Sequence, residues 1–445
     1  MKRVATLILA ALPMAVLAQT PAPTVTEKVE VTEKTTTVAV VAEKKSPITF
    51  TPYGFVLLNA FMSDTPFSSK LYPGQVLPCA TGNTTGCNLG GSVNMTAQQS
   101  RIGMNLAYDD TAGWTKAKLA ARFEMDFNGG YSATTNSTTF YNALFRLRLA
   151  YMTASWGGFS VLAGQDYALL APLFATSVAW QAVPIFWQAG NMWNRSPQIK
   201  VAFDAAPKTG FAFGLAAAAL NPSDATAAEN PTGITTSPGA AVDFGAGNRS
   251  RMPVFEGRVY AGIRSNGVKT VELGFSGHTN TRRYNSPGNG QTFDVNENAV
   301  ALDLDVNLWI LNLRAEAWRG NAIDDFYAGI VQPPVVIRTS GTGATATITK
   351  VQSVATSGGW AQLVLKPFDF LQLTAGYGVE VANTADMVGI AGTTRYRNSQ
   401  FAYGLIFPAG KYWRFAFEGC NTITNYYGGQ NADGAMYSVS SQLSF

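Results

Sequence analysis

Charged residues recur at every second position in several short segments of this sequence. Arg122, Glu124 and Asp126 alternate with apolar residues in one segment, and Arg146 and Arg148 do so in the next. Alternate residues of a β-strand point to the same face of a sheet, so these charges are expected to share one face. A face that carries so many charges must be hydrated, and guanidinium groups in a narrow wet passage attract and guide anions.

The same alternation assigns further charged residues to this face. Its basic members are Arg101, Arg122, Arg146, Arg148, Arg258, Arg264, Arg314 and Arg414. Its acidic members are Glu124, Asp126, Glu256, Asp303, Asp305, Glu316 and Glu418. We expect these side chains to line a lumen and to contact solutes there.

Three of the arginines are expected to form a row across neighbouring strands. A tight turn at 109–114 would place Arg101 opposite Arg122, and a loop at 128–143 would place Arg122 opposite Arg148. Like charges that oppose each other in a sheet cost energy, so an uncompensated row indicates a function such as an anion pathway. The alternative is that the two carboxylates of the middle strand neutralise the arginines in an ordinary ion-pair network. The sequence leaves both interpretations open.

The connection at 170–196 has an unusual composition for a long loop. It contains no Asp or Glu, and its large apolar side chains need cover from water. A loop that folds into the lumen as a constriction would supply that cover, and a loop that covers a subunit interface is the alternative. The residues expected to form the constriction are Trp180, Phe186, Trp187, Trp193 and Arg195.

Catalytic and metal-binding chemistry has little support in this sequence. His278 is the only histidine, and it belongs to no recognisable motif of nucleophile and base. We expect it to be a solvated residue near the outer end of a strand. One histidine and three scattered cysteines do not supply a metal site, so we predict neither an enzyme nor a cofactor.

The cysteines indicate an oxidising compartment. Cys79 and Cys87 lie close together in a polar segment rich in Gly, Thr and Asn. Exported proteins form disulfides, so we predict that this pair is joined and that Cys420 remains a free thiol.

The N-terminal residues resemble a secretory signal. Lys2 and Arg3 precede an apolar run that ends in small residues, so 1–18 is predicted to be a signal peptide. Residues 19–46 are rich in Thr, Val, Glu and Lys and lack aromatic residues, which predicts a disordered periplasmic segment. The remainder, 47–445, is predicted to be a single β-barrel.

The barrel is predicted from composition and periodicity together. Charged residues make up only 13% of the chain, against about 25% in typical soluble proteins. An exported chain with few charges and no apolar run long enough for a spanning helix can cross a membrane only as a closed sheet. A formal net charge of +4 is too small to suggest nucleic acid as a partner. We therefore expect an outer-membrane protein of a Gram-negative-type bacterium, with outer-membrane lipids around it.

Sixteen alternating segments can be distinguished after residue 46, and they are joined by connections that alternate between long and short. Asn266-Gly267 is a strong signal for a tight hairpin turn. Outer-membrane barrels combine long extracellular loops, short periplasmic turns and an even number of strands. The predicted fold is therefore all-β: a transmembrane antiparallel β-barrel of sixteen strands with both termini in the periplasm.

The last strand ends in Phe445 after a run of alternating apolar residues, which is typical of the signal that the barrel-assembly machinery recognises. Five segments also occur in the order found in one known group. GFVLLNAFMSD, QSRIGMNLAY, RFEMDFNGG, LRLAYMTA and LAGQDYALLAP resemble the first five strands of DcaP-type trimeric outer-membrane porins. The resemblance covers roughly residues 50–200 well and the remainder only in pattern.

The resemblance implies a homotrimer of sixteen-stranded barrels, a constriction loop after the fifth strand and a preference for small anionic solutes such as carboxylates. It assigns family positions to Arg101, Glu124, Asp126 and Arg148. The family's long N-terminal coiled-coil segment is not evident in this sequence. The expected function is passive diffusion of small hydrophilic solutes. A structural or adhesive barrel whose loops bind partners is the alternative.

Overall fold

The computed structural model describes residues 48–78, 90–129, 143–222, 246–286, 289–323, 327, 335–341 and 347–445. All of them belong to one compact unit, Pro47–Phe445. The predicted signal peptide, the predicted N-terminal segment and the Cys79–Cys87 disulfide lie outside the described residues.

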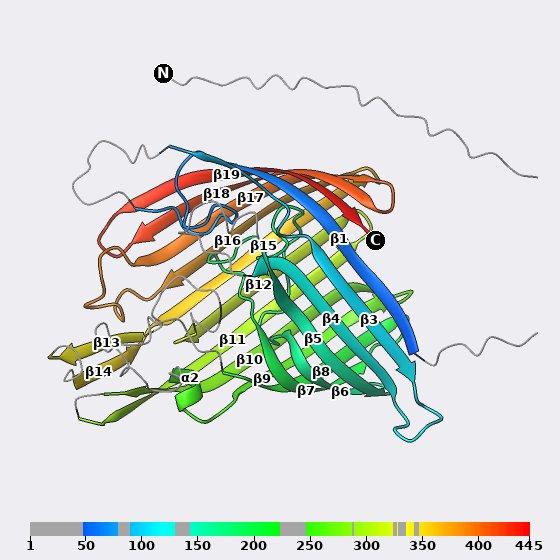
Figure 1. The fold of residues 1–445 in the computed structure, drawn as a ribbon, viewed down its shortest axis with the longest axis horizontal. Coiled ribbons are helices and arrows are strands. Elements are labelled where there is room, and N and C mark those ends of the chain that lie inside the picture. Colours follow the sequence, from blue (N-terminus) through cyan, green and yellow to red (C-terminus); the bar gives the residue numbers. More distant parts are fainter. Residues whose placement is uncertain are drawn as a thin grey trace, which may run out of the picture. The chain divides into compact units, whose positions relative to one another are not determined.

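The unit is a sheet of long antiparallel strands that closes on itself (Figure 1). The first half contains β1 (Ile48–Ser63), β2 (Ser92–Thr96), β3 (Arg101–Asp109), β4 (Lys118–Gly129), β5 (Leu144–Trp156), β6 (Phe159–Tyr167), β7 (Arg195–Ala205), β8 (Gly210–Leu220) and β9 (Val254–Ser265). The second half contains β10 (Val268–Asn285), β11 (Thr292–Leu308), β12 (Leu311–Asn321), β15 (Ala355–Phe368), β16 (Leu371–Ala382), β17 (Arg395–Ala409), β18 (Trp413–Tyr426) and β19 (Asn431–Ser444). Outside the sheet lie a hairpin of β13 (Val335–Ser340) and β14 (Thr347–Ser353), and the short helix α2 (Ala246–Arg249).

The sheet closes where β1 pairs with β19, from Phe55 opposite Ser444 to Ser63 opposite Met436. The other edge of β1 pairs with β3 and then with β2, so these two strands occupy one position in the wall. The predicted barrel of 16 strands is therefore confirmed. Phe445 exchanges backbone hydrogen bonds with Gly54 at 3.0 and 3.2 Å, next to this closure. A side chain at Gly54 would collide with the Phe445 ring and the Arg101 carbonyl oxygen.

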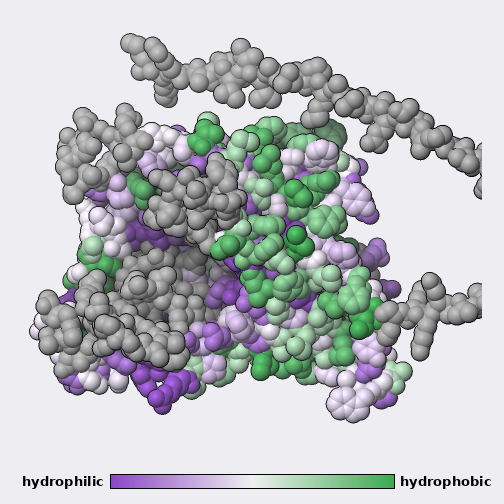
Figure 2. Space-filling model, in the orientation of Figure 1, coloured by the Kyte–Doolittle hydropathy of each residue, from purple (hydrophilic) through white to green (hydrophobic). Residues whose placement is uncertain are grey.

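Apolar side chains face outward and polar side chains face inward, as the alternation predicts. Along β11, Val300 and Leu302 are exposed, while Asp303 and Asp305 are buried inside. Exposed apolar residues cover much of the outer surface (Figure 2). A closed barrel with such a belt spans a lipid bilayer, because each backbone group is paired within the sheet and the belt contacts hydrocarbon. None of the helices among the described residues is long and apolar enough to cross a membrane.

The connections differ from the expectation in several places. The turn between β3 and β4 runs over 110–117, because Asp110 accepts hydrogen bonds from both the amide and the hydroxyl of Thr115. The Thr115 hydroxyl bond also holds the pKa of Asp110 below its usual value. Strands β10 and β11 continue past their expected ends, which shortens the loop expected at 283–297 to six residues. The connection at 321–357 contains the β13–β14 hairpin, which the sequence analysis missed.

Asn266-Gly267 forms the turn between β9 and β10. Both residues have positive φ, 50° and 79°, which is the backbone conformation of a type I′ hairpin turn. This connection is confirmed in position and in kind.

The depth of the apolar belt generates a prediction. Leu302→Arg places a charge on the outer face near the middle of β11, where the barrel should lose about 2–4 kcal/mol of stability. Asn298→Arg, four residues nearer the outer end of the same face, should cost only about 0–1 kcal/mol. Urea unfolding in lipid vesicles measures both, and equal losses would contradict the assignment of the belt.

Candidate functional site

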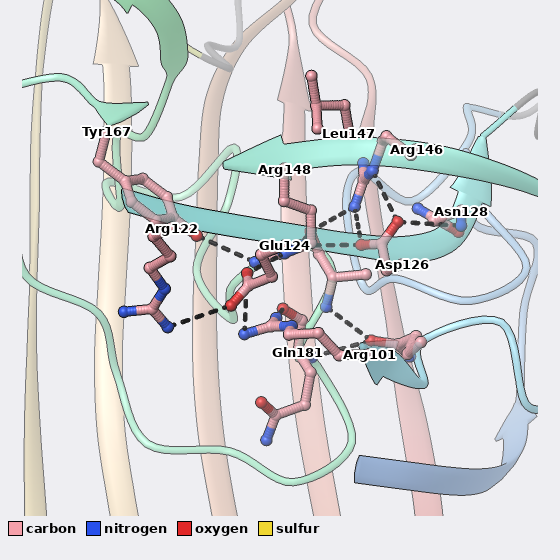
Figure 3. Close-up of polar contacts among 12 residues, drawn as sticks. Arg101, Arg122, Glu124, Asp126, Asn128, Arg146, Leu147, Arg148, Tyr167 and Gln181 are labelled. Atoms are coloured by element: carbon pink, nitrogen blue, oxygen red, sulfur yellow. Dashed lines mark hydrogen bonds and ion pairs between the residues drawn. The ribbon is translucent and has the colours of Figure 1, made fainter. Parts of the chain in front are cut away.

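A cluster of four arginines and two carboxylates covers the inner face of β3, β4 and β5 (Figure 3). Glu124 lies at its centre and is buried. It pairs with Arg101 at 3.5 Å, Arg122 at 3.3 Å and Arg148 at 2.8 Å. One carboxylate is therefore shared by three guanidinium groups.

Asp126 is the second acid of the cluster and is fully buried. It pairs with Arg146 at 2.6 Å and with Arg148 at 2.9 Å, and it also accepts the backbone amide of Asn128. Arg148 pairs with both carboxylates, and only 3% of its side chain is exposed. These two ion pairs hold the buried guanidinium group in place.

The expected opposition of Arg101, Arg122 and Arg148 is wrong. Arg101 lies opposite Asp126, and Arg122 lies opposite Tyr151. The longer turn after β3 shifts the pairing of β3 with β4, and a bulge between Glu124 and Met125 shifts β5. The arginines therefore meet carboxylates instead of each other, as the alternative interpretation stated.

The carboxylates do not cancel the cluster's charge, because four arginines share two acids. A fifth cation, Arg195 at the start of β7, lies over the rings of Tyr167 and Trp193 at 5.7 and 5.0 Å. The side chains of Arg122, Arg146 and Arg101 are 36%, 24% and 17% exposed, whereas that of Arg148 is only 3% exposed. An excess of positive charge thus faces the lumen.

Two tyrosines that the sequence analysis did not single out complete the cluster. The Tyr53 hydroxyl donates to Glu124 at 2.9 Å and accepts from Arg122 at 2.7 Å. The Tyr167 hydroxyl accepts from Arg148 at 3.0 Å. Their positions on β1 and β6 flank the charged strands, but a tyrosine in a strand carries no signal that distinguishes a lumen partner from an interfacial one.

A second basic group lies on the inner face of β9–β12. Its cations are Arg258, Arg264, Lys269 and Arg314, and its acids are Glu272, Asp303 and Asp305. Four cations again share fewer acids. Arg414 lies on the inner face of β18, as expected, and donates to the amide oxygen of Gln442 on β19 at 2.8 and 3.0 Å.

The loop 168–194 folds into the barrel, where inward-facing side chains accept its backbone amides. Glu256 accepts the amide of Leu169 on one side of the barrel. Glu418 accepts those of Val178 and Ala179 on another, at 2.9 and 2.7 Å. Further contacts of this kind come from Ser276, Glu316, Gln362 and Gln99. The wall therefore holds the loop from several directions.

The loop also touches the arginine cluster and covers its own aromatic residues. Its carbonyl groups at Gln181 and Ala182 accept hydrogen bonds from Arg101 and Arg146 at 2.9 and 3.1 Å. Trp180 and Phe186 are buried, and Phe186 stacks on Trp360 of β15. Trp187 and Trp193 pack against the apolar cluster that contains Trp180, Phe186 and Trp360.

A second inward segment, 64–78, was expected to be part of an outer loop. Its backbone is bound by β17 and β18: Gln400 donates to the Pro73 carbonyl group and the Tyr426 hydroxyl donates to that of Val76. The Leu71 carbonyl group accepts from the Trp180 indole at 3.2 Å. The two inward segments therefore pack together, a feature that the mixed polar and apolar sequence of 64–78 did not indicate.

His278 is buried and bonded, so the expectation of a solvated strand end is wrong. Strand β10 continues to Asn285, which places His278 inside the strand. Its ring lies 2.9 Å from Glu256 and 3.2 Å from Glu297. Tyr327 donates to Glu256 as well. Because Glu256 also holds the loop through Leu169, this histidine supports the loop's anchor.

The buried acid of the arginine cluster generates a prediction. Asp126→Asn leaves Arg148 buried with one charged partner fewer, which should cost about 3 kcal/mol of unfolding free energy. Asp166→Asn is the control, because Asp166 pairs with Lys200 at 2.7 Å and both side chains are partly exposed. That change should cost below about 1 kcal/mol. Similar losses in urea titrations of the two variants would show that the buried network is not special.

No protein-family model matches the sequence, and no curated protein matches it. Among solved structures, the outer-membrane channel DcaP of Acinetobacter baumannii is similar, with a TM-score of 0.65 and 17% identity over 89% of this chain and 97% of that one. An anion-selective porin from Comamonas acidovorans has a TM-score of 0.51 and 12% identity over 89% of this chain and 100% of that one. The resemblance seen in the sequence thus extends to the structure, and this chain has the barrel fold of the DcaP channel.

Proposed function

We propose that this chain is an outer-membrane porin through which small hydrophilic solutes diffuse passively, with a preference for anions such as carboxylates. The observation that carries the proposal is the excess of arginines over carboxylates on β3–β5, beside a loop that folds into the lumen. The second basic group on β9–β12 supports it from across the barrel. The loop 168–194 acts as the size filter.

The mechanism requires no energy source. An anion enters the lumen and exchanges part of its water for the partly exposed guanidinium groups of Arg101 and Arg122. Arg146 and Arg148 stay bound to Asp126 and position the loop carbonyl group at Ala182. In this proposal Arg101 and Arg122 attract the solute, and Arg146 and Arg148 maintain the shape of the passage.

The proposed assembly is a homotrimer inserted by the barrel-assembly machinery through the strand that ends in Phe445. Exposed apolar side chains supply the surface that subunits and outer-membrane lipids contact. A band that resists detergent in unheated gels and collapses to one chain on boiling supports the trimer, and a single-chain mass in detergent solution contradicts it.

Selectivity tests the proposed anion preference. The double variant Arg101→Gln and Arg122→Gln leaves two arginines for two carboxylates, so the local excess of positive charge disappears. In planar bilayers with a salt gradient, the reversal potential should shift toward cations, and the shift should shrink as salt screens the charges.

The matched control changes two exposed lysines of periplasmic turns, Lys116→Gln and Lys208→Gln. It removes the same charge outside the lumen and should leave the reversal potential unchanged. A wild-type channel that prefers cations, or a double variant with unaltered selectivity, would overturn the proposed preference. A purified, folded barrel without conductance would overturn the porin function itself and favour a structural or adhesive role.

The loop's attachment generates a separate prediction. Glu418→Ala removes the acceptor of the Val178 and Ala179 amides, so the loop should loosen and single-channel conductance and current noise should increase. Glu418→Gln removes the same charge but keeps an oxygen acceptor, and its conductance should stay closer to the wild type. If both variants behave alike, the charge of Glu418 and not its hold on the loop controls conduction.

A further inference from the structure

A groove of about 910 Å³ lies in the wall formed by β8–β12. The side chains that line it include Leu215, Phe255, Val259, Phe275 and Val300, all of them exposed. They belong to the outward-facing set of these strands, so the groove opens toward the lipid and not toward the lumen.

Two glycines form the floor of this groove. Gly257 and Gly277 lie directly opposite each other on β9 and β10, and Ala217 on β8 lies opposite Gly257. A Cβ atom at either glycine would meet only a backbone oxygen at 3.8 Å, so packing does not require the glycines. The missing side chains leave a depression in an otherwise filled apolar belt.

Polar residues border the groove toward the outer end of the strands. Thr279, Asn298 and Asn321 follow one another across β10, β11 and β12, and Asn321 donates to Asn298 at 3.1 Å. The polar row marks the level at which the belt gives way to the hydrated region. The groove therefore runs up to the height of lipid headgroups in the outer leaflet.

Arg319 stands at the end of the glycine row. The row continues from Gly277 to Val300 and then to Arg319, which is exposed on the outer face of β12. Among the described residues, Arg319 forms no ion pair. An arginine on the lipid face is costly unless it reaches the interface and finds a partner there, and a guanidinium group binds phosphate through two hydrogen bonds.

We propose that this groove binds a phosphate-bearing acyl lipid of the outer leaflet, with an acyl chain over Gly257 and Gly277 and the phosphate on Arg319. The apolar walls match hydrocarbon, the depression matches a chain that lies against the strands, and the cation matches the charge of the headgroup. The site lies on the outer face of the barrel and not in the lumen, so the test of lipid binding does not depend on the proposed porin function.

The test uses the purified full chain in detergent and native mass spectrometry. The probes are dimyristoyl phosphatidic acid and dimyristoylglycerol, which carry the same chains but differ in the phosphate. Wild-type protein should retain the phosphatidic acid several-fold better than the diacylglycerol. Arg319→Gln should abolish this difference, and Arg319→Lys should keep part of it.

Gly277→Leu should fill the groove and weaken the binding of both probes. The added side chain enters open space, so the barrel itself should be undisturbed. The first control is Ala361→Leu, an exposed position on β15 outside the groove. The second is Lys366→Gln, which removes a cation near the periplasmic end of the same strand. Both should bind like the wild type. Unchanged binding in Arg319→Gln and Gly277→Leu overturns the proposal. So does a change of oligomeric state in Gly277→Leu with lipid binding intact, which would assign the groove to a second copy of the chain.

Discussion

Closure of the sheet is the constraint on which the rest of this structure depends. A backbone in hydrocarbon has no water to bond, so each strand needs a partner on both edges, and the bonds between β1 and β19 complete the ring. Closure divides the side chains into an outer apolar set and an inner polar set. The lumen therefore collects charges from the whole length of the chain, and these charges are stabilised by ion pairs with each other and by hydrogen bonds to the inward loops.

The inner carboxylates divide into two groups with different tasks. Glu124 and Asp126 bind arginines and fix the geometry of a charged wall. Glu256 and Glu418 accept hydrogen bonds from backbone amides of the loop 168–194. The cluster on β3–β5 itself keeps four arginines for two carboxylates. Acids that hold the loop do not contribute to the neutralisation of the arginine cluster.

Periodicity in the sequence is sufficient to predict the strands of the barrel wall, because the alternation along one strand does not depend on how that strand is paired with its neighbours. It placed β4 and its charges on the inner face correctly. The register between strands was not accessible, since the extra residues of the turn closed by Asp110 and the bulge beside Glu124 are set by particular side-chain contacts. The composition of 170–196 indicated a loop in need of cover. The inward path of 64–78 depends on contacts with β17 and β18, and the burial of His278 depends on the full length of β10 and on Glu256 and Glu297 of the neighbouring strands. No short stretch of sequence encodes these contacts.

The attachments of the loop 168–194 have a consequence for the order of assembly. The loop is made between β6 and β7, yet the groups that hold it come from Asn59 on β1, Glu256 on β9, Glu316 on β12 and Glu418 on β18. Those groups surround a common space only after the last strand has joined the first. The passage therefore acquires its final cross-section at the end of folding. In an incompletely closed barrel, the groups that bind the loop would not yet be in place.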